Sequence, residues 1–208
     1  MKIKVCGTRD AGNIEELIKL SPDMIGFIFY PCSKRYASGL DKQVVMDIPG
    51  NIKKVGVFVN QLLDEVESTS TNYRLDYLQL HGDETPEFCH TLKKKGHKII
   101  KVFGIAEPAD FDGIRQYENH VDLFLFDTKS SLHGGTGQKF KWDLLDHYHL
   151  PKPFFLSGGI SPKDIENLKQ AYVKYKPYGI DINSKFETSP GFKDIGKTKD
   201  FIKVIKKI

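Results

Sequence analysis

Eight short apolar runs rich in β-branched and aromatic residues recur along the chain, and they constrain its fold more than any other feature. Most stretches between them have amphipathic helical spacing, and Thr85-Pro86 and Ser161-Pro162 are typical of helix starts. Strands that alternate with helices predict a parallel sheet. The runs are residues 3–6, 24–30, 53–59, 77–82, 98–105, 123–128, 153–160 and 178–184.

Eight strand–helix units predict a closed (β/α)8 TIM barrel, and 208 residues place it near the lower size limit of that fold. We expect one barrel domain over residues 1–208, because no low-complexity linker divides the chain. A doubly wound open sheet is the competing architecture. It usually has fewer strands, and no GxGxxG motif follows the first run to support it.

Alternation within the runs predicts which side chains point into the barrel. Successive residues of a strand face opposite sides, and the outward side of a barrel strand packs against apolar helix surfaces. Polar residues that alternate with Leu, Ile or Val are therefore expected inside the barrel. These residues are Lys4, Gln79, Lys101 and Asp127.

Composition and charge exclude several classes of protein. The net charge of +4 is far below that of a dedicated nucleic-acid binder, and no apolar stretch approaches the roughly 18 residues of a membrane span or resembles a signal peptide. The three cysteines, Cys6, Cys32 and Cys89, have neither disulfide-framework nor zinc spacing. We expect a reduced cytoplasmic protein without a metal or other cofactor, monomeric by default, that binds neither membrane nor nucleic acid.

Polar residues collect at the carboxyl ends of the runs, where the active sites of such barrels form. An acid, a base and a cation at one end of the barrel are difficult to explain as core packing. The set contains Cys6, Arg35, Asn60, His81, Asp127, Ser157, Gly158, Gly159, Asp181, Asn183 and Ser184.

Two glycine-rich segments follow the later runs. Gly158 and Gly159 lie between the seventh run and a helix start, where backbone N–H groups bind phosphate. The loops after strands seven and eight commonly form the phosphate site of these barrels, so Ser184 joins the predicted grip. The segment at 133–137, HGGTG, is either a mobile cover or a simple turn.

At this point the sequence resembles the phosphoribosylanthranilate isomerase family, which catalyses the third step of tryptophan biosynthesis. The resemblance covers nearly the whole chain, and its motifs occur in the family's order. The matching stretches are KVCG (4–7), GFIFYPCSKRY (26–36), VGVFVN (55–60), LQLHGDE (78–84), LFDT (125–128), GGTGQKFKW (134–142), LSGGI (156–160) and GIDINSKFETSPGFKD (179–194).

The resemblance implies an Amadori rearrangement of N-(5-phosphoribosyl)anthranilate, a phosphosugar attached to anthranilate. Ring opening requires a general acid, and isomerisation of the resulting imine requires a base that takes the proton from the sugar C2. The resemblance assigns the base to Cys6 and the acid to Asp127. It assigns the anthranilate carboxylate to Arg35, whose guanidinium suits bidentate binding. His81 is expected to contact substrate or to be structural, and Asp181 to bind sugar hydroxyls.

The barrel order agrees with these roles, because a phosphate held after strands seven and eight lies between Asp127 and Cys6. The two groups need opposite changes of pKa. Asp127 requires a raised pKa to stay protonated near neutral pH, whereas Cys6 requires some thiolate character.

Three other interpretations stay open from the sequence. The Amadori isomerase of histidine biosynthesis is expected to use two aspartates, and Cys6 at the first strand argues against it. A non-catalytic phosphate-binding barrel would not need both Cys6 and Asp127, and nucleic-acid binding is disfavoured by the modest charge.

One residue departs from the family pattern, which commonly reads Asp-Val-Ser-Ser-Gly-Val-Glu after the eighth strand. Lys185 stands here in place of the glycine. It is either strained at a positive φ or unstrained at a negative φ. In the second case its ammonium either reaches the phosphate or stays in water.

Overall fold

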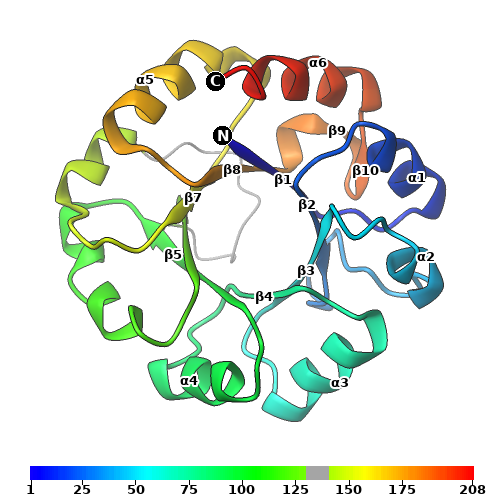
Figure 1. Cartoon of the computed structure of the whole chain (residues 1–208), viewed down its shortest axis with the longest axis horizontal. Helices are drawn as coiled ribbons and strands as arrows, with labels where there is room; N and C mark the ends of the chain where they lie inside the picture. The colour runs from blue at the N-terminus through cyan, green and yellow to red at the C-terminus, as the bar shows by residue number, and fades with distance from the viewer. Residues whose placement is uncertain (130–140) are drawn as a thin grey trace.

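The computed structural model describes residues 1–129 and 141–208, and its eight parallel strands close into a barrel in chain order (Figure 1). This architecture confirms the predicted (β/α)8 barrel and excludes the open sheet. The barrel closes between the first and last strands, where Lys4 lies beside Asp181. The strands are β1 (Lys2–Cys6), β2 (Met24–Ile28), β3 (Lys53–Phe58), β4 (Tyr77–Leu80), β5 (Ile99–Ile105), β6 (Leu123–Thr128), β7 (Phe154–Leu156) and β8 (Gly179–Ile182).

Helices surround the barrel (Figure 1), and their starts follow the sequence signals. Thr85 caps α4 by accepting a hydrogen bond from the Phe88 N–H, and Ser161 pairs with Asp164 ahead of α5. The α-helices in the described residues are α1 (Ala11–Lys19), α2 (Lys42–Met46), α3 (Leu63–Tyr73), α4 (Pro86–Lys94), α5 (Ile165–Tyr175) and α6 (Ile195–Ile205).

The connections around β6 depart from a regular strand–helix repeat. Two short 3₁₀ helices, η1 and η2, replace an α-helix between β5 and β6, and Pro108 and Gly113 stand at their starts. The described residues between β6 and β7 form another 3₁₀ helix, η3. The 3₁₀ helices of the described chain are η1 (Pro108–Phe111), η2 (Ile114–Tyr117), η3 (Trp142–His147), η4 (Pro162–Asp164) and η5 (Ser184–Phe186).

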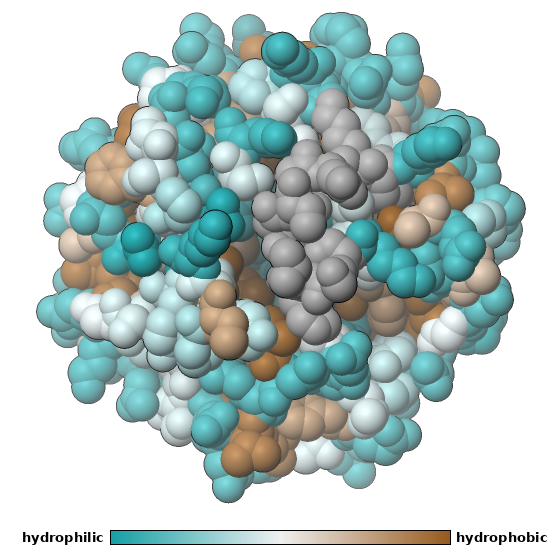
Figure 2. Space-filling model, turned by 180° about the vertical axis from the view of Figure 1, so that it is seen from behind, coloured by the Kyte–Doolittle hydropathy of each residue, from teal (hydrophilic) through white to brown (hydrophobic). Residues whose placement is uncertain are grey.

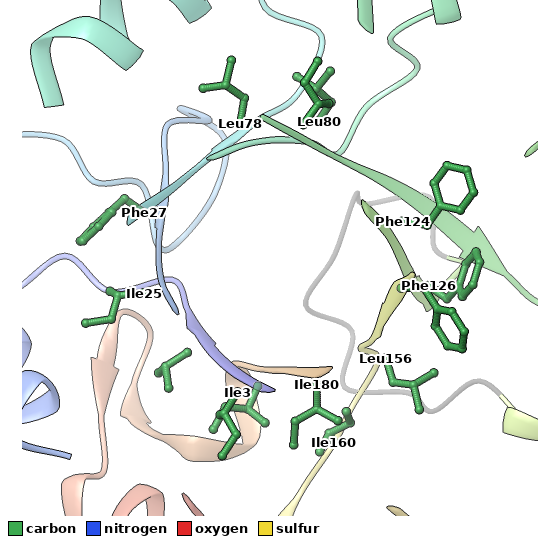
Figure 3. Close-up of a cluster of buried hydrophobic side chains, with 14 of the residues drawn as sticks. Ile3, Ile25, Phe27, Leu78, Leu80, Phe124, Phe126, Leu156, Ile160 and Ile180 are labelled. Carbon is green, nitrogen blue, oxygen red and sulfur yellow. The ribbon is translucent and has the colours of Figure 1, made fainter. Parts of the chain in front are cut away.

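The core has an inner part within the barrel and a larger outer part between strands and helices. Figure 3 shows Leu78, Leu80, Phe124 and Phe126 pointing away from the barrel axis, in the outer part. Because side chains alternate, the residues between them face the interior. The inner cluster consists of Met24, Val55, Ile100, Val102, Leu123, Leu125 and Phe155, with Tyr77 against it.

The expected interior positions hold for three of the four polar residues. Lys4, Gln79 and Asp127 alternate with outward apolar residues and lie on the interior side. The expectation for Lys101 is wrong. Ile100 and Val102 occupy the interior, so Lys101 faces outward beside Leu80. It is nevertheless buried, because its ammonium bonds the Gly82 carbonyl and the Glu84 carboxylate beneath the β4–α4 loop.

A two-stranded hairpin that the sequence did not predict lies between η5 and α6. Its strands are β9 (Glu187–Ser189) and β10 (Phe192–Lys193), which pair antiparallel. The side chain of Asn13 in α1 binds both the N–H and the carbonyl of Lys193. The hairpin is thereby fixed to α1, and the buried Lys193 side chain reaches Asn183 after β8, at the carboxyl end of the barrel.

Candidate active site

Cys6 is the last residue of β1, and its side chain is almost completely buried on the interior side. Gly26 on β2 makes room for the sulfur, because a Cβ at this position would lie 2.8 Å from Cys6 Sγ. Burial raises the pKa of the Cys6 thiol, and the charge of Lys4 opposes this increase. The resting thiol is therefore shifted away from the thiolate that a general base requires.

Asp127 lies near the end of β6 and faces the same interior side. Its Oδ1 accepts a 2.7 Å hydrogen bond from the Thr128 N–H, and its Oδ2 lies 3.7 Å from His81 Nε2. Burial raises the pKa of Asp127 to about 6, against the opposing effect of the Thr128 hydrogen bond. This carboxyl group therefore holds its proton far better than an ordinary aspartate.

His81 follows β4 and is oriented from behind by Gln79. Gln79 Nε2 lies 3.4 Å from His81 Nδ1, and the other ring nitrogen faces Asp127. Both His81 and Asp127 line a cavity of about 390 Å³, to which Phe103 and Tyr117 contribute aromatic walls. The acid is therefore reachable from this cavity, whose aromatic walls the sequence did not single out.

Lys4 and Asp181 form an ion pair inside the barrel, with Lys4 Nζ 2.9 Å from Asp181 Oδ1. Burial lowers the pKa of Lys4, but the Asp181 carboxylate and the Cys6 thiol raise it more, so Lys4 is charged. Asp181 therefore already has a cationic partner before any sugar hydroxyl arrives.

The glycine-rich loop after β7 lies directly against the acid. Gly158 has φ +83°, and a Cβ there would lie 2.5 Å from Thr128 Oγ1 and 3.2 Å from Asp127 Oδ1. Only glycine fits this close approach and this left-handed backbone. Gly159 is also at positive φ, and Ser184 begins η5 after the neighbouring strand β8. The predicted phosphate residues thus follow β7 and β8, between the strands that carry Asp127 and Cys6.

Arg35 lies on the other side of Cys6, in the connection that follows β2. Its side chain and that of Asn183 both approach Gly7. The guanidinium binds Glu187 on β9 rather than facing the site without a partner. Arg35 therefore lies against Gly7, the residue after Cys6, and the Glu187 carboxylate fixes the orientation of its guanidinium.

Glu187 and Lys193 of the hairpin are polar site residues that the sequence analysis missed. Lys193 Nζ lies 2.7 Å from both Glu187 Oε1 and Asn183 Oδ1. Burial opposes ionisation of Glu187, but Arg35 and Lys193 together hold its pKa below the ordinary value. Both residues lie within the stretch 179–194 that carries the family resemblance, which was the available signal.

The remaining candidates from the sequence either lie away from Asp127 or have a structural role. Asn60 holds the β4–α4 loop, since its Oδ1 accepts the Asp83 N–H. Cys32 is exposed and Cys89 is buried in α4, and neither joins the residues around Asp127. The segment 133–137 lies outside the described residues. Within 1–129 and 141–208, no cluster of three or more His, Cys, Asp or Glu side chains could hold a metal ion.

Lys185 takes the unstrained of the two expected conformations. It lies in η5, its φ is outside the left-handed region, and its side chain is exposed. The loop therefore accommodates lysine without backbone strain.

Comparison with known proteins identifies the family. Residues 3–204 match the family described as N-(5'phosphoribosyl)anthranilate (PRA) isomerase. The N-(5'-phosphoribosyl)anthranilate isomerase of Parabacteroides distasonis is 47% identical over 207 residues, which are 99% of this chain and 93% of that protein.

Two solved structures of phosphoribosylanthranilate isomerases match the whole chain. One is a complex with reduced 1-(o-carboxyphenylamino)-1-deoxyribulose 5-phosphate, and the other shows monomers of the dimeric isomerase of Thermotoga maritima. Each has a TM-score of 0.84 and 29% identity, with 100% of both chains covered. The chain therefore belongs to the N-(5'-phosphoribosyl)anthranilate isomerase family.

Proposed function

We propose that Asp127 and Cys6 catalyse the Amadori rearrangement of N-(5-phosphoribosyl)anthranilate to 1-(2-carboxyphenylamino)-1-deoxyribulose 5-phosphate, a reaction of tryptophan biosynthesis. The observation that carries this assignment is the contact of the predicted phosphate loop with the acid: a Cβ on Gly158 would lie 3.2 Å from Asp127 Oδ1. A sugar phosphate bound by this loop brings its ring to the carboxyl group.

The first step is ring opening. Asp127 gives its proton to the furanose oxygen as the C1–O bond breaks, and the anthranilate nitrogen supplies the electron pair that forms the imine. The raised pKa of Asp127, about 6, favours a carboxyl group that still carries the proton it must donate.

The second step is proton abstraction from C2. The Cys6 thiolate takes this proton, and the electrons of the C–H bond move toward the imine to give an enolamine. The C2 hydroxyl then gives up a proton, which restores the Asp127 carboxyl group, and C1 takes the proton held by Cys6, which restores the thiolate and yields the aminoketose. The overall reaction is an isomerisation, so the chain needs no external oxidant, reductant or cofactor.

The proposed binding residues contact three parts of the substrate: the phosphate, the anthranilate carboxylate and the sugar. Gly158, Gly159 and Ser184 are proposed to bind the phosphate through backbone and hydroxyl groups at two loop ends. Arg35 is proposed to bind the anthranilate carboxylate, and Asp181 and His81 to contact the sugar. The Arg35 guanidinium, whose side chain approaches Gly7 next to Cys6, supports the placement of the carboxylate end.

One assay tests the function. Purified protein is mixed with freshly formed phosphoribosylanthranilate, and the decay of the substrate's fluorescence is followed, with Cys6→Ala and Asp127→Asn as controls. A decay no faster than in these variants would refute the assignment. The isomerase substrate of histidine biosynthesis is assayed in parallel, since its turnover would favour the alternative in which another phosphosugar is used.

We also propose that the whole chain acts as one catalytic domain, as a monomer in the cytoplasm. The residues proposed for the site all come from one barrel.

On the face in Figure 2, hydrophobic residues are scattered among hydrophilic ones. None of the described helices has the length and apolar character to cross a membrane. Because the T. maritima relative is dimeric, sedimentation analysis decides the oligomeric state.

A further inference from the structure

Lys4 is an unusual residue to find at the centre of a barrel. Its side chain has no exposed surface, and it lies on the same face of β1 as Cys6, two residues further along. Burying an ammonium is costly unless charged or polar partners surround it. The position therefore requires an electrostatic explanation that apolar core packing does not provide.

The ammonium of Lys4 interacts with two groups within the barrel. It donates to Asp181 Oδ1 at 2.9 Å, and the nearby Cys6 side chain raises the pKa of the ammonium. The pairing of β1 with β8 aligns Lys4 with Asp181, while alternation along β1 aligns Lys4 with Cys6. One cation thus lies between the carboxylate of one strand and the thiol of another.

Two other charged groups, Lys193 and Asp181, also affect the pKa of Cys6. Lys193 of β10 attracts negative charge on the sulfur, but its ammonium binds Asn183 and Glu187. Asp181 of β8 acts in the opposite sense, since its carboxylate repels a thiolate. Lys4 is therefore the cation with the strongest effect on Cys6.

We propose that Lys4 is the counter-charge of Cys6, a positioning residue whose ammonium stabilises the thiolate at the end of β1. This inference rests on the proposed role of Cys6 as the base. Lys4 acts through the sulfur. When the thiol loses its proton, the new negative charge forms next to a cation that is already oriented by Asp181, so little reorganisation is needed.

The arrangement predicts opposite effects for the two neighbours of the sulfur. Burial raises the pKa of the Cys6 thiol, Lys4 lowers it and Asp181 raises it. Loss of the Lys4 charge should therefore make the thiol a weaker acid. Loss of the Asp181 charge should make it a stronger acid, because the ammonium then interacts with the sulfur alone.

The experiment measures the titration of Cys6 in the substrate-free protein. Thiolate absorbance in the ultraviolet is recorded against pH for each variant, and the absorbance of its Cys6→Ser counterpart is subtracted from it, which removes the contributions of Cys32 and Cys89. The variants are Lys4→Met and Asp181→Asn. Lys101→Met is the matched control, since it removes another buried, paired lysine outside the barrel.

Lys4→Met is expected to move the Cys6 midpoint upward by about 1–3 pH units, as loss of a close opposite charge typically does. The midpoint of Lys101→Met should match that of wild type. A Lys4→Met midpoint equal to that of wild type overturns the proposal, even if the variant is less stable. Where Lys4→Met does not fold, Asp181→Asn decides, and a midpoint that does not fall overturns the proposal.

The titration uses no substrate, so it is independent of the assay for the proposed function. If the protein does not consume phosphoribosylanthranilate but its Cys6 midpoint depends on Lys4, the proposed function is refuted and the lysine–thiolate pair is still supported. Because Asp127 titrates near 6 and the thiol at higher pH, the Cys6 titration sets the basic limb of kcat/KM against pH in an active protein, and this limb should move upward in Lys4→Met by the same amount as the midpoint. A limb that does not move would show that the pair has no role in turnover.

Discussion

Arg35 and Glu187 are 152 residues apart in the sequence and form a bidentate ion pair beside the barrel mouth. Arg35 Nε lies 2.9 Å from Glu187 Oε1, and Nη2 lies 2.7 Å from Oε2. Lys193 and the Gly191 N–H hold the same carboxylate from the other side. Within the described part of the chain, the third nitrogen, Nη1, forms no hydrogen bond, so it is the group available to a substrate carboxylate.

Arg35→Ala is expected to raise KM for phosphoribosylanthranilate by about 10- to 100-fold, the loss of one or two charge-assisted hydrogen bonds. The effect on kcat should be smaller, because the proposed partner is remote from the reacting carbon. Steady-state kinetics measure both constants. Arg35→Lys should bind almost as poorly, since a point charge loses the bidentate geometry that Glu187 fixes. An unchanged KM in both variants would refute the assignment.

Cys6→Ala and Asp127→Asn should each lower kcat by roughly 10²–10⁴-fold, which is the usual contribution of a general base or acid. Circular dichroism should show an intact fold for both. Cys32→Ala is the matched control, because Cys32 is an exposed cysteine in a loop and should retain wild-type kcat. Near-normal turnover in either site variant would show that its role is misassigned.

Asp127 should give the enzyme a characteristic dependence on pH. Burial raises the pKa of Asp127 to about 6, so the protonated form that donates to the ring oxygen decreases above that value. Because the Cys6 thiolate is needed as well and its pKa lies above the ordinary value, the gain of thiolate offsets the loss of protonated Asp127 above about pH 6. We therefore expect kcat/KM to rise up to about pH 6 and then to level off until the thiol titrates. The measurement is kcat/KM against pH for the free enzyme, and a profile that keeps rising through pH 6 without this bend would contradict the acid role.

The same shift predicts the sign of a stability change. Between the ordinary aspartate pKa of 3.8 and about 6, the folded protein binds the Asp127 proton more tightly than the unfolded chain, so stability falls as pH rises. Asp127→Asn removes the titrating group and therefore also removes this loss of stability with rising pH. The variant should be more stable than wild type by about 1–3 kcal/mol above pH 6. The difference in urea unfolding should disappear below pH 4, and its persistence there would point to another cause.

Strand alternation predicted the barrel and the inward position of Asp127, yet it failed at Lys101. In β5 both faces are apolar, with Ile99 and Ile100 adjacent, so the pattern does not distinguish inside from outside. Lys101 looked like an interior residue because interior positions tolerate polar groups. Its actual burial depends on Glu84 in a loop, and pairing across a loop is not encoded in the pattern of one strand.

The hairpin shows a second limit of the sequence pattern. Residues 187–193 are mostly polar and contain Pro190 and Gly191, which is typical of a surface turn. Glu187 and Lys193 are buried only because Arg35 and Asn183 reach them from distant parts of the chain. Family resemblance supplied the location of this segment, whereas its ion-pair network required three-dimensional contacts.

Lys185 gives a prediction that separates backbone conformation from phosphate binding. Because its φ is not in the left-handed region, Lys185→Gly should destabilise the protein by about 0.5–1 kcal/mol through backbone entropy. Lys185→Ala should not. Urea unfolding of the two variants measures this difference.

The same Lys185→Ala variant tests the charge, through KM measured at several salt concentrations. A raised KM with a weaker salt dependence than in wild type would support a contact between the ammonium and the phosphate. A KM and a salt dependence that both match wild type would mean that the lysine is only solvated.

The Glu84–Lys101 pair, at the edge of the cavity that Asp127 and His81 line, is expected to be a costly ion pair to break. Both side chains are only 3% exposed, and Glu84 also accepts the N–H groups of Asn60 and Gly82. Glu84→Ala leaves a buried ammonium without its carboxylate and should cost about 3–5 kcal/mol of unfolding free energy. The control is Glu166→Ala, which breaks an exposed pair with Lys169 and should cost less than about 1 kcal/mol.

Replacing both members of the buried pair shows whether the stability cost of Glu84→Ala comes from the lost attraction or from the unpaired charge that this variant leaves. Glu84→Gln combined with Lys101→Met leaves no buried charge, so it should recover part of the stability that Glu84→Ala loses. The measurement is the urea-unfolding free energy of Glu84→Ala, Glu166→Ala and the double variant, each relative to wild type, at neutral pH. If Glu84→Ala costs no more than Glu166→Ala, then Lys101 must reach water when its partner is removed. In that case the β4–α4 loop would be looser than its hydrogen bonds indicate.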